Sequence, residues 1–193
     1  MLHPDATASL AAALDPDPSP VLGAGDRLAA VLAPIVLEPE PALIFTVRAA
    51  ALSRHAGEIS FPGGLQDPGE RLAETALREL HEEIGLDPST LRVLGALPAV
   101  HTFVSRILVV PFVGTLDRAR GFTVNQGEID EVLVFGLDRL ALAERRVTYE
   151  RPDGSVWRGF AYELDGHTVW GATGWMLHTL LETIRKETTW PMP

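Results

Sequence analysis

The chain contains no cysteine and is short of basic residues. The absence of cysteine excludes disulfide frameworks, thiolate zinc sites and cysteine nucleophiles. Sixteen Lys and Arg stand against 26 Asp and Glu, so the formal net charge is -10. That balance excludes a basic footprint for duplex DNA or RNA, and no nucleic-acid partner is expected. A protein this acidic needs local cations or a bound metal to hold an anionic ligand.

Long hydrophobic runs are also missing. No stretch approaches the roughly 18 uninterrupted apolar residues of a membrane-spanning helix, so no membrane partner is expected. The first ten residues contain no Lys or Arg and do not resemble a signal peptide, which favours a cytoplasmic location. The 193 residues are 46% apolar. This is enough for one domain with a sizeable core.

The hydrophobic pattern predicts an alternation of strands and helices. The clearest helix covers 70–84, where Ala73, Ala76, Leu77, Leu80 and Ile84 form one apolar face, with Gly85 at the stop position. The remaining predicted elements are helices over 6–14, 25–32, 138–144 and 172–186; strands over 42–48, 91–100, 106–114, 132–135, 146–151, 156–164 and 168–170; loops over 54–66 and 118–127; and turns at 152–154 and 165–166. This order favours an α/β sandwich, with residues 1–40 as an N-terminal extension that packs on a single domain.

Three carboxylates gather in the last turns of the helix predicted over 70–84. Glu79, Glu82 and Glu83 share one patch, because residues three and four apart are neighbours on a helix surface. They repel one another and oppose the helix dipole at its C-terminal end. A solvated polar face would explain a lone glutamate cluster, but a hard cation bound by oxygen ligands compensates this one better.

The surrounding residues form a specific pattern. Gly64, Glu70, Arg78, Glu79, Leu80, Glu82, Glu83, Gly85 and Leu86 fit G-x5-E-x7-R-E-U-x-E-E-x-G-U, where U is aliphatic. The chain therefore resembles a Nudix hydrolase. The resemblance implies an α/β/α sandwich around a mixed sheet. It also implies hydrolysis of a nucleoside diphosphate linked to another group, with Mg²⁺ or Mn²⁺.

The resemblance assigns roles to the residues of this pattern. Glu79, Glu82 and Glu83 hold the divalent ions, and the Gly64 carbonyl is a further ligand. A bound ion bridges phosphate oxygens and lowers the pKa of a bound water. The general base is either Glu82 or Glu128. Glu70 and Arg78 pair and brace the loop against the helix.

The segment before this pattern resembles a subfamily signature, L-L-T-x-R-[SA]-x3-R-x3-G-x3-F-P-G-G, of the coenzyme A pyrophosphatases. The matching residues are Thr46, Arg48, Ala49, Gly57, Phe61, Pro62, Gly63 and Gly64. Ser53 stands where the signature has its second Arg, and Arg54 follows it. The resemblance implies that Arg48, Arg54, Gly63 and Gly64 bind the substrate, since guanidinium groups meet phosphate in a two-pronged geometry.

The C-terminal half carries two further likenesses to this subfamily. Asn125 with 128–132 resembles N-x-x-E-V-x-E-V, and 169–173 resembles its W-G-A-T segment. Trp170 is expected in the core and Thr173 at the start of the last helix. The expected reaction is metal-dependent cleavage of coenzyme A, or of its derivatives, to 4'-phosphopantetheine and adenosine 3',5'-bisphosphate. The alternatives are a Nudix enzyme for ADP-ribose or an oxidised nucleotide, and a binding domain without catalysis. The sequence is compatible with a monomer or a homodimer.

Overall fold

The computed structural model describes residues 4–50, 57–102, 106–150 and 154–188. The elements follow one another as α1 (Pro4–Ala12), β1 (Arg27–Val36), β2 (Ala42–Arg48), β3 (Ile59–Ser60), β4 (Gly63–Leu65), α2 (Leu72–Ile84), η1 (Pro88–Thr90), β5 (Arg92–Ala96), β6 (Val100–Thr102), β7 (Ile107–Leu116), β8 (Ile129–Gly136), α3 (Leu137–Ala143), β9 (Glu144–Glu150), β10 (Val156–Leu164), β11 (His167–Val169) and α4 (Gly171–Glu187).

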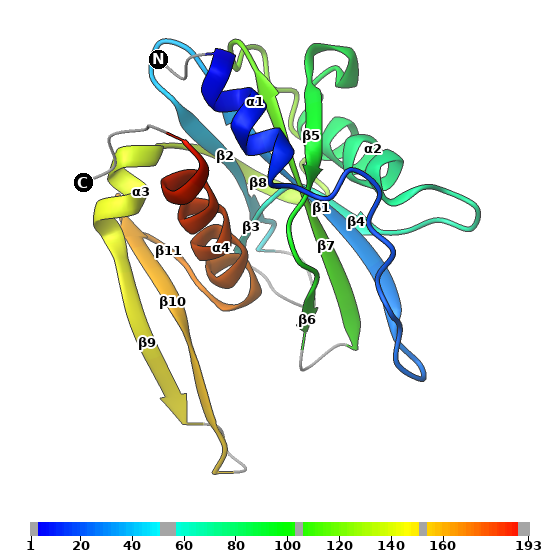
Figure 1. Cartoon of the computed structure of the whole chain (residues 1–193). Helices are drawn as coiled ribbons and strands as arrows, with labels where there is room; N and C mark the ends of the chain where they lie inside the picture. The colour runs from blue at the N-terminus through cyan, green and yellow to red at the C-terminus, as the bar shows by residue number, and fades with distance from the viewer. Residues whose placement is uncertain (1–3, 51–56, 103–105, 151–153, 189–193) are drawn as a thin grey trace.

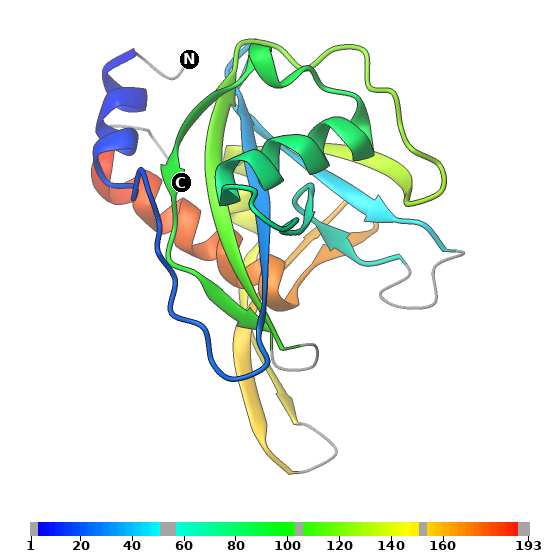
Figure 2. The same ribbon diagram turned by 90° about the vertical axis from the view of Figure 1, so that its right-hand side faces the viewer.

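A mixed sheet lies at the centre of the molecule (Figure 1). β1 and β7 pair in parallel along their full lengths, from Arg27 opposite Ile107 to Val36 opposite Leu116. The other edge of β1 pairs antiparallel with β2 at one end and with β4 at the other. Helix α2 covers one face of this sheet, and α1 and α4 lie on the opposite side (Figure 2). The predicted α/β/α sandwich with a mixed sheet is confirmed.

Strand β1 is buried on both faces, and this corrects one prediction. Ala29, Val31 and Ile35 face the core beneath α1 and α4, whereas Ala30 and Leu32 face the core beneath α2. A strand that is covered on both faces is apolar throughout, so it lacks the alternation that marks a half-buried strand. The helix predicted over 25–32 is therefore wrong.

The N-terminal segment packs on the sheet layers ahead of β1. Helix α1 lies against α4 and β5, and Leu10 and Leu14 are buried in the core on that side. Residues 27–36 belong to the central sheet itself. The part of the chain that precedes the sheet is therefore shorter than the 40 residues expected.

Other expectations differ in detail. The predicted loop over 54–66 contains the short strands β3 and β4, which pair with β2 and β1. Trp170 is 44% exposed instead of buried, because it lies where the chain leaves β11 and α4 begins. The residue before α4 is Trp170, with no side-chain cap, so Thr173 lies inside the first turn and is buried. Two residues of the predicted 152–154 turn, Pro152 and Asp153, lie outside the described residues.

Across the described residues, no helix is both long and apolar enough to cross a membrane. The cytoplasmic location stays a prediction.

Candidate active site

Helix α2 presents one apolar and one acidic side. Ala76, Leu80 and Ile84 are buried against the sheet. The helix begins with a capping box in which Glu74 accepts a hydrogen bond from the Arg71 backbone N–H at 3.0 Å. It ends at Gly85, whose left-handed φ of 71° suits glycine. These signals fix the register of the helix, and the register places the glutamates on the other side.

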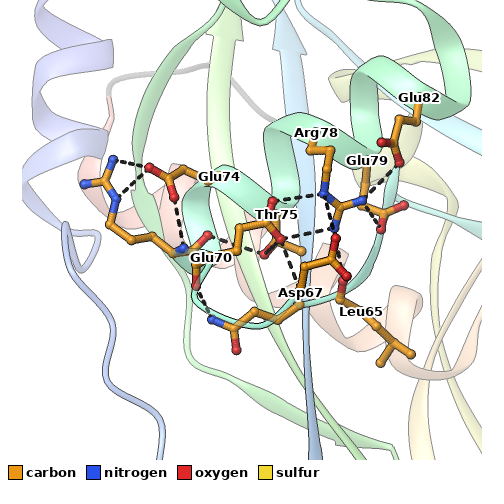
Figure 3. Close-up of polar contacts among 10 residues, drawn as sticks. Leu65, Asp67, Glu70, Glu74, Thr75, Arg78, Glu79 and Glu82 are labelled. Carbon is orange, nitrogen blue, oxygen red and sulfur yellow. Dashed lines mark hydrogen bonds and ion pairs between the residues drawn. The ribbon is translucent and has the colours of Figure 1, made fainter.

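Arg78 joins the loop before α2 to the helix. Its Nε donates to Glu70 Oε1 at 2.9 Å and its Nη2 to Glu70 Oε2 at 3.1 Å. Nη2 also donates to the Leu65 carbonyl at 3.1 Å, which ties β4 to the same guanidinium (Figure 3). Thr75 Oγ1 donates to Glu70 Oε2 at 2.7 Å. The expected Glu70–Arg78 brace is present, and these hydrogen bonds, first that of Arg78, lower the pKa of Glu70 to about 2.

The same guanidinium also reaches the acidic patch. Arg78 Nη1 donates to Glu79 Oε1 at 2.8 Å and to Glu82 Oε2 at 3.0 Å (Figure 3). The Glu79 side chain is 15% exposed and that of Glu82 is 52% exposed. One guanidinium thus donates hydrogen bonds to three carboxylates. Burial raises the pKa of Glu79 despite the Arg78 contact.

Glu83 is the buried member of the patch. It is 3% exposed, and its Oε2 accepts a hydrogen bond from the Gly63 backbone N–H at 3.3 Å. Burial raises its pKa to about 8, and the nearby charges of Glu79 and Glu128 act in the same direction. A carboxyl group in this setting is mostly protonated at neutral pH, and a further positive charge nearby would favour its ionised form.

Two glycines of β4 let the chain run close to these carboxylates. A Cβ on Gly64 would lie 2.4 Å from the Glu79 carboxylate carbon, and one on Gly63 would lie 2.4 Å from the Ala30 carbonyl oxygen. A larger residue at position 63 would therefore push β4 away from β1, and one at position 64 would displace the Glu79 carboxylate or β4. The absence of side chains here keeps the Gly64 backbone beside Glu79.

Arg48 and Glu128 come from segments distant in sequence. Arg48 ends β2, and its Nε is buried with no hydrogen-bond partner among the described residues. Its charge lowers the pKa of Glu83, whereas that of Glu128 raises it, so both groups lie near Glu83. Glu128 is exposed, and its backbone carbonyl accepts a hydrogen bond from the Ala49 N–H at 2.8 Å. Arg54 lies outside the described residues.

The loop before β8 holds the end of α2 in a way that the sequence did not indicate. The Asn125 N–H donates to the Glu83 carbonyl at 2.9 Å, and the Thr123 N–H donates to the Ile84 carbonyl at 2.9 Å. Thr123 also lies so close to Gly85 that a Cβ there would meet it at 2.8 Å. These backbone contacts carry no sequence signal. The role of Thr75 was also not predicted from the sequence. Its hydroxyl lies in the first turn of α2, five residues after Glu70, and this spacing could have suggested their hydrogen bond.

The donor set suits a hard divalent cation. Glu79 and Glu83 are desolvated carboxylates with raised pKa values, and the Gly64 backbone lies beside one of them. Such oxygen donors are the ligands that Mg²⁺ and Mn²⁺ prefer. Within the described ranges, no three Asp, Glu or His side chains converge closely enough to chelate an ion. Arg78 instead bonds one carboxylate oxygen of Glu79 and one of Glu82.

Comparison with known proteins gives a consistent result. The sequence profile of the NUDIX domain matches residues 26–153. The chain is 33% identical over 172 residues to a protein from Photorhabdus laumondii described as the uncharacterized Nudix hydrolase NudL, covering 88% of this chain and 91% of that one. It is 38% identical over 157 residues to NudL from Pectobacterium atrosepticum, and this alignment covers 80% of this chain and 81% of that one. The structure of the MutT protein from Methanosarcina mazei has a TM-score of 0.56 at 15% identity, covering 86% and 98%, and this likeness concerns the fold.

The family profile covers more than half of the chain, and relatives above 30% identity align along most of their length. Members of this family hydrolyse nucleoside diphosphate derivatives and generally use divalent metal ions. The chain therefore belongs to the Nudix hydrolases and is a pyrophosphohydrolase.

Proposed function

We propose that this enzyme cleaves the pyrophosphate bond of coenzyme A, giving 4'-phosphopantetheine and adenosine 3',5'-bisphosphate. The observation that carries the proposal is Arg48 Nε, which is buried near Glu83 without a partner in the described part of the chain. A buried donor left unpaired is costly, and a phosphate oxygen would satisfy it. Arg48 also lies in the 43–64 segment, whose residues resemble the signature of the coenzyme A pyrophosphatases.

We propose that Glu79, Glu82 and Glu83, with the Gly64 carbonyl, hold Mg²⁺ or Mn²⁺. When bound, the ion offsets the negative charge of the diphosphate and lowers the pKa of the attacking water. The fit rests on the oxygen donors described above and on the scarcity of other cations: Arg78 is already shared between Glu70, Glu79 and Glu82.

The chain's own groups account for binding and proton transfer. Arg48 binds a phosphate oxygen of the substrate. Water attacks one phosphorus, the bond from that phosphorus to the bridging oxygen breaks, and the water proton passes to a carboxylate. Glu82 and Glu128 are both exposed and near the buried carboxylates, so either can accept this proton. Glu70 keeps Arg78 in place, and Gly63 and Gly64 keep the backbone close to the substrate's phosphates.

The decisive experiment is a product assay. The purified protein is incubated with Mn²⁺ and coenzyme A, ADP-ribose or an oxidised deoxynucleoside triphosphate, and the products are identified by mass. We expect the two half-molecules of coenzyme A, formed faster than any product of the other substrates. Faster cleavage of ADP-ribose or of the oxidised nucleotide would overturn the coenzyme A assignment. Binding of coenzyme A without turnover would indicate a domain without catalysis.

Arg48→Ala tests the residue that carries the proposal. The variant should raise KM for coenzyme A by about tenfold or more, since charge-assisted hydrogen bonds contribute about 1.5–3 kcal/mol. Arg92→Ala is the matched control, because Arg92 is exposed at the start of β5, away from the acidic patch. An unchanged KM in Arg48→Ala would remove the support for phosphate binding at this position.

We also propose that the whole chain forms one domain. The burial of Leu10 and Leu14 among residues of the sheet and α4 supports this.

A further inference from the structure

The β9–β10 hairpin extends away from the body of the molecule (Figures 1 and 2). The two strands pair from Glu144 opposite Tyr162 to Glu150 opposite Val156. β11 joins them only at 162–164, so the outer half of the hairpin consists of two strands. A two-stranded hairpin is marginally stable in water and gains from a third strand or a packing surface.

The outer edge of β9 has no strand beside it in the described part of the chain, where the small sheet has the order β11-β10-β9. An edge strand presents unpaired backbone N–H and C=O groups, which readily pair with another strand. Arg146, Thr148, Tyr149 and Glu150 are exposed. Neither the Arg146 nor the Glu150 side chain forms an ion pair or hydrogen bond with any residue that the structure describes. This edge is therefore accessible in both backbone and side chains.

The sequence of β9 is complementary to itself. When two copies of one strand pair antiparallel, a two-fold axis perpendicular to the sheet relates them, so opposed residues face the same side and their numbers have an even sum. With Thr148 opposite the partner subunit's Thr148, Arg146 faces the partner's Glu150 and Val147 faces the partner's Tyr149. Opposite charges, an aromatic with a β-branched residue, and a threonine pair are the combinations that stabilise cross-strand contacts.

The neighbouring register lacks this complementarity. With Val147 at the axis, Glu144 would face the partner subunit's Glu150, and like charges opposite one another destabilise a sheet. Arg146 would then face the partner's Thr148 and lose its ion pair. Charge complementarity thus favours the arrangement centred on Thr148.

The aromatic face of the hairpin continues this surface. Tyr149 stacks on Trp157 with ring centres 5.5 Å apart and lies 5.9 Å from Trp170. Tyr149 and Trp170 remain 43% and 44% exposed. A second copy in the Thr148 register would place its Val147 against Tyr149 and cover part of this aromatic surface. Exposed apolar patches of this kind are typical of protein–protein contacts, because covering them removes apolar surface from water.

We propose that two copies of this chain associate through β9, antiparallel, with Thr148 on the two-fold axis. The interface joins the three-stranded sheets of the two copies into one sheet and covers the exposed β9 edge of each copy. It involves neither the acidic patch nor Arg48, and so it is independent of the proposed hydrolysis.

Two charge reversals test the interface and its register. Arg146→Glu and Glu150→Arg each place like charges opposite one another at two symmetry-related positions. We expect a dimeric wild type, and at least about a tenfold larger dimer Kd for each variant in sedimentation equilibrium. When the two variants are mixed, both positions again carry opposite charges. Native mass spectrometry should then show the heterodimer in excess, and the double variant R146E/E150R should dimerise like the wild type.

Circular dichroism and coenzyme A cleavage of each variant serve as controls for folding, because neither side chain has a partner in the described protomer. A wild type that is monomeric at high micromolar concentration would overturn the proposal. Single variants that dimerise like the wild type would show that another surface is used. Single variants that are monomeric and also fail to form the heterodimer would exclude the Thr148 register.

Discussion

The Glu70–Arg78 brace makes the stability of the fold depend on pH in a predictable way. Glu70 is 14% exposed and receives two hydrogen bonds from Arg78 and one from Thr75, which lower its pKa from 4.5 to about 2. Because the folded-state pKa is depressed, the ionised carboxylate stabilises the fold above pH 4.5, and this contribution disappears as the pH falls toward 2. We expect Glu70→Gln to remove the contribution while keeping the size of the side chain.

The magnitude follows from the shift. A change of this size corresponds to at most about 3 kcal/mol, and solvent at the edge of the site screens it to about 1–2 kcal/mol. Urea unfolding at pH 7 should therefore show Glu70→Gln less stable than the wild type by about 1–2 kcal/mol. The difference should shrink by more than half at pH 3, because the carboxyl group is then largely protonated in the unfolded chain but still mostly ionised in the folded protein.

Glu74→Gln is the matched control. Glu74 also contacts an arginine, Arg71, but its side chain is 49% exposed and a Gln can keep its capping hydrogen bond, so Glu74→Gln should change the stability and its pH dependence much less than Glu70→Gln. Equal free energies of unfolding for wild type and Glu70→Gln at pH 7 would refute the reasoning. So would a difference that stays constant from pH 7 to pH 3, because it would then not arise from ionisation.

Three further predictions concern the site and the core. Glu83→Gln should remain folded but lose most of its turnover, measured by product release, and most of its affinity for Mn²⁺, measured by calorimetry. The control is Glu163→Gln, because Glu163 is exposed on β10. Wild-type turnover in Glu83→Gln would show that Glu83 does not belong to the metal site. Gly64→Ala should lower turnover by about a hundredfold, because its Cβ would lie 2.4 Å from the Glu79 carboxylate carbon and would displace that carboxylate. Normal kinetics would show that the position of the Glu79 carboxylate does not limit turnover. Leu80→Ala should lower the free energy of unfolding by about 2–5 kcal/mol, since Leu80 is fully buried in the core beneath α2; a loss below 1 kcal/mol would mean that the core relaxes around the cavity.

Part of the chain's excess negative charge is concentrated around helix α2. Glu70, Glu79 and Glu82 all contact Arg78, so a single guanidinium offsets much of the negative charge that the helix gathers. Glu83 is left out of this network and is buried beside the Gly63 N–H. The patch therefore still lacks positive charge, which supports the cation site proposed above.

Local patterns in the sequence determined the helix that carries the chemistry. The spacing of apolar residues predicted α2, Gly85 predicted its end, and the order of glutamates predicted their common patch. The Glu70–Arg78 pair could also be predicted, because the motif that contains both residues is specific. These features depend on periodicity and on neighbours within about two turns, which a single sequence displays directly.

Only the tertiary structure decided what surrounds the helix. Strand β1 was mistaken for a helix because a strand buried on both faces has no alternation, and only the packing of α2 and α4 on its two sides distinguishes the cases. The approach of Arg48 and Glu128 to Glu83, and the backbone hydrogen bonds from Asn125, join segments more than 30 residues apart. Such contacts arise from sheet pairing and loop closure, which depend on the whole fold, whereas the motif depends on a few consecutive turns.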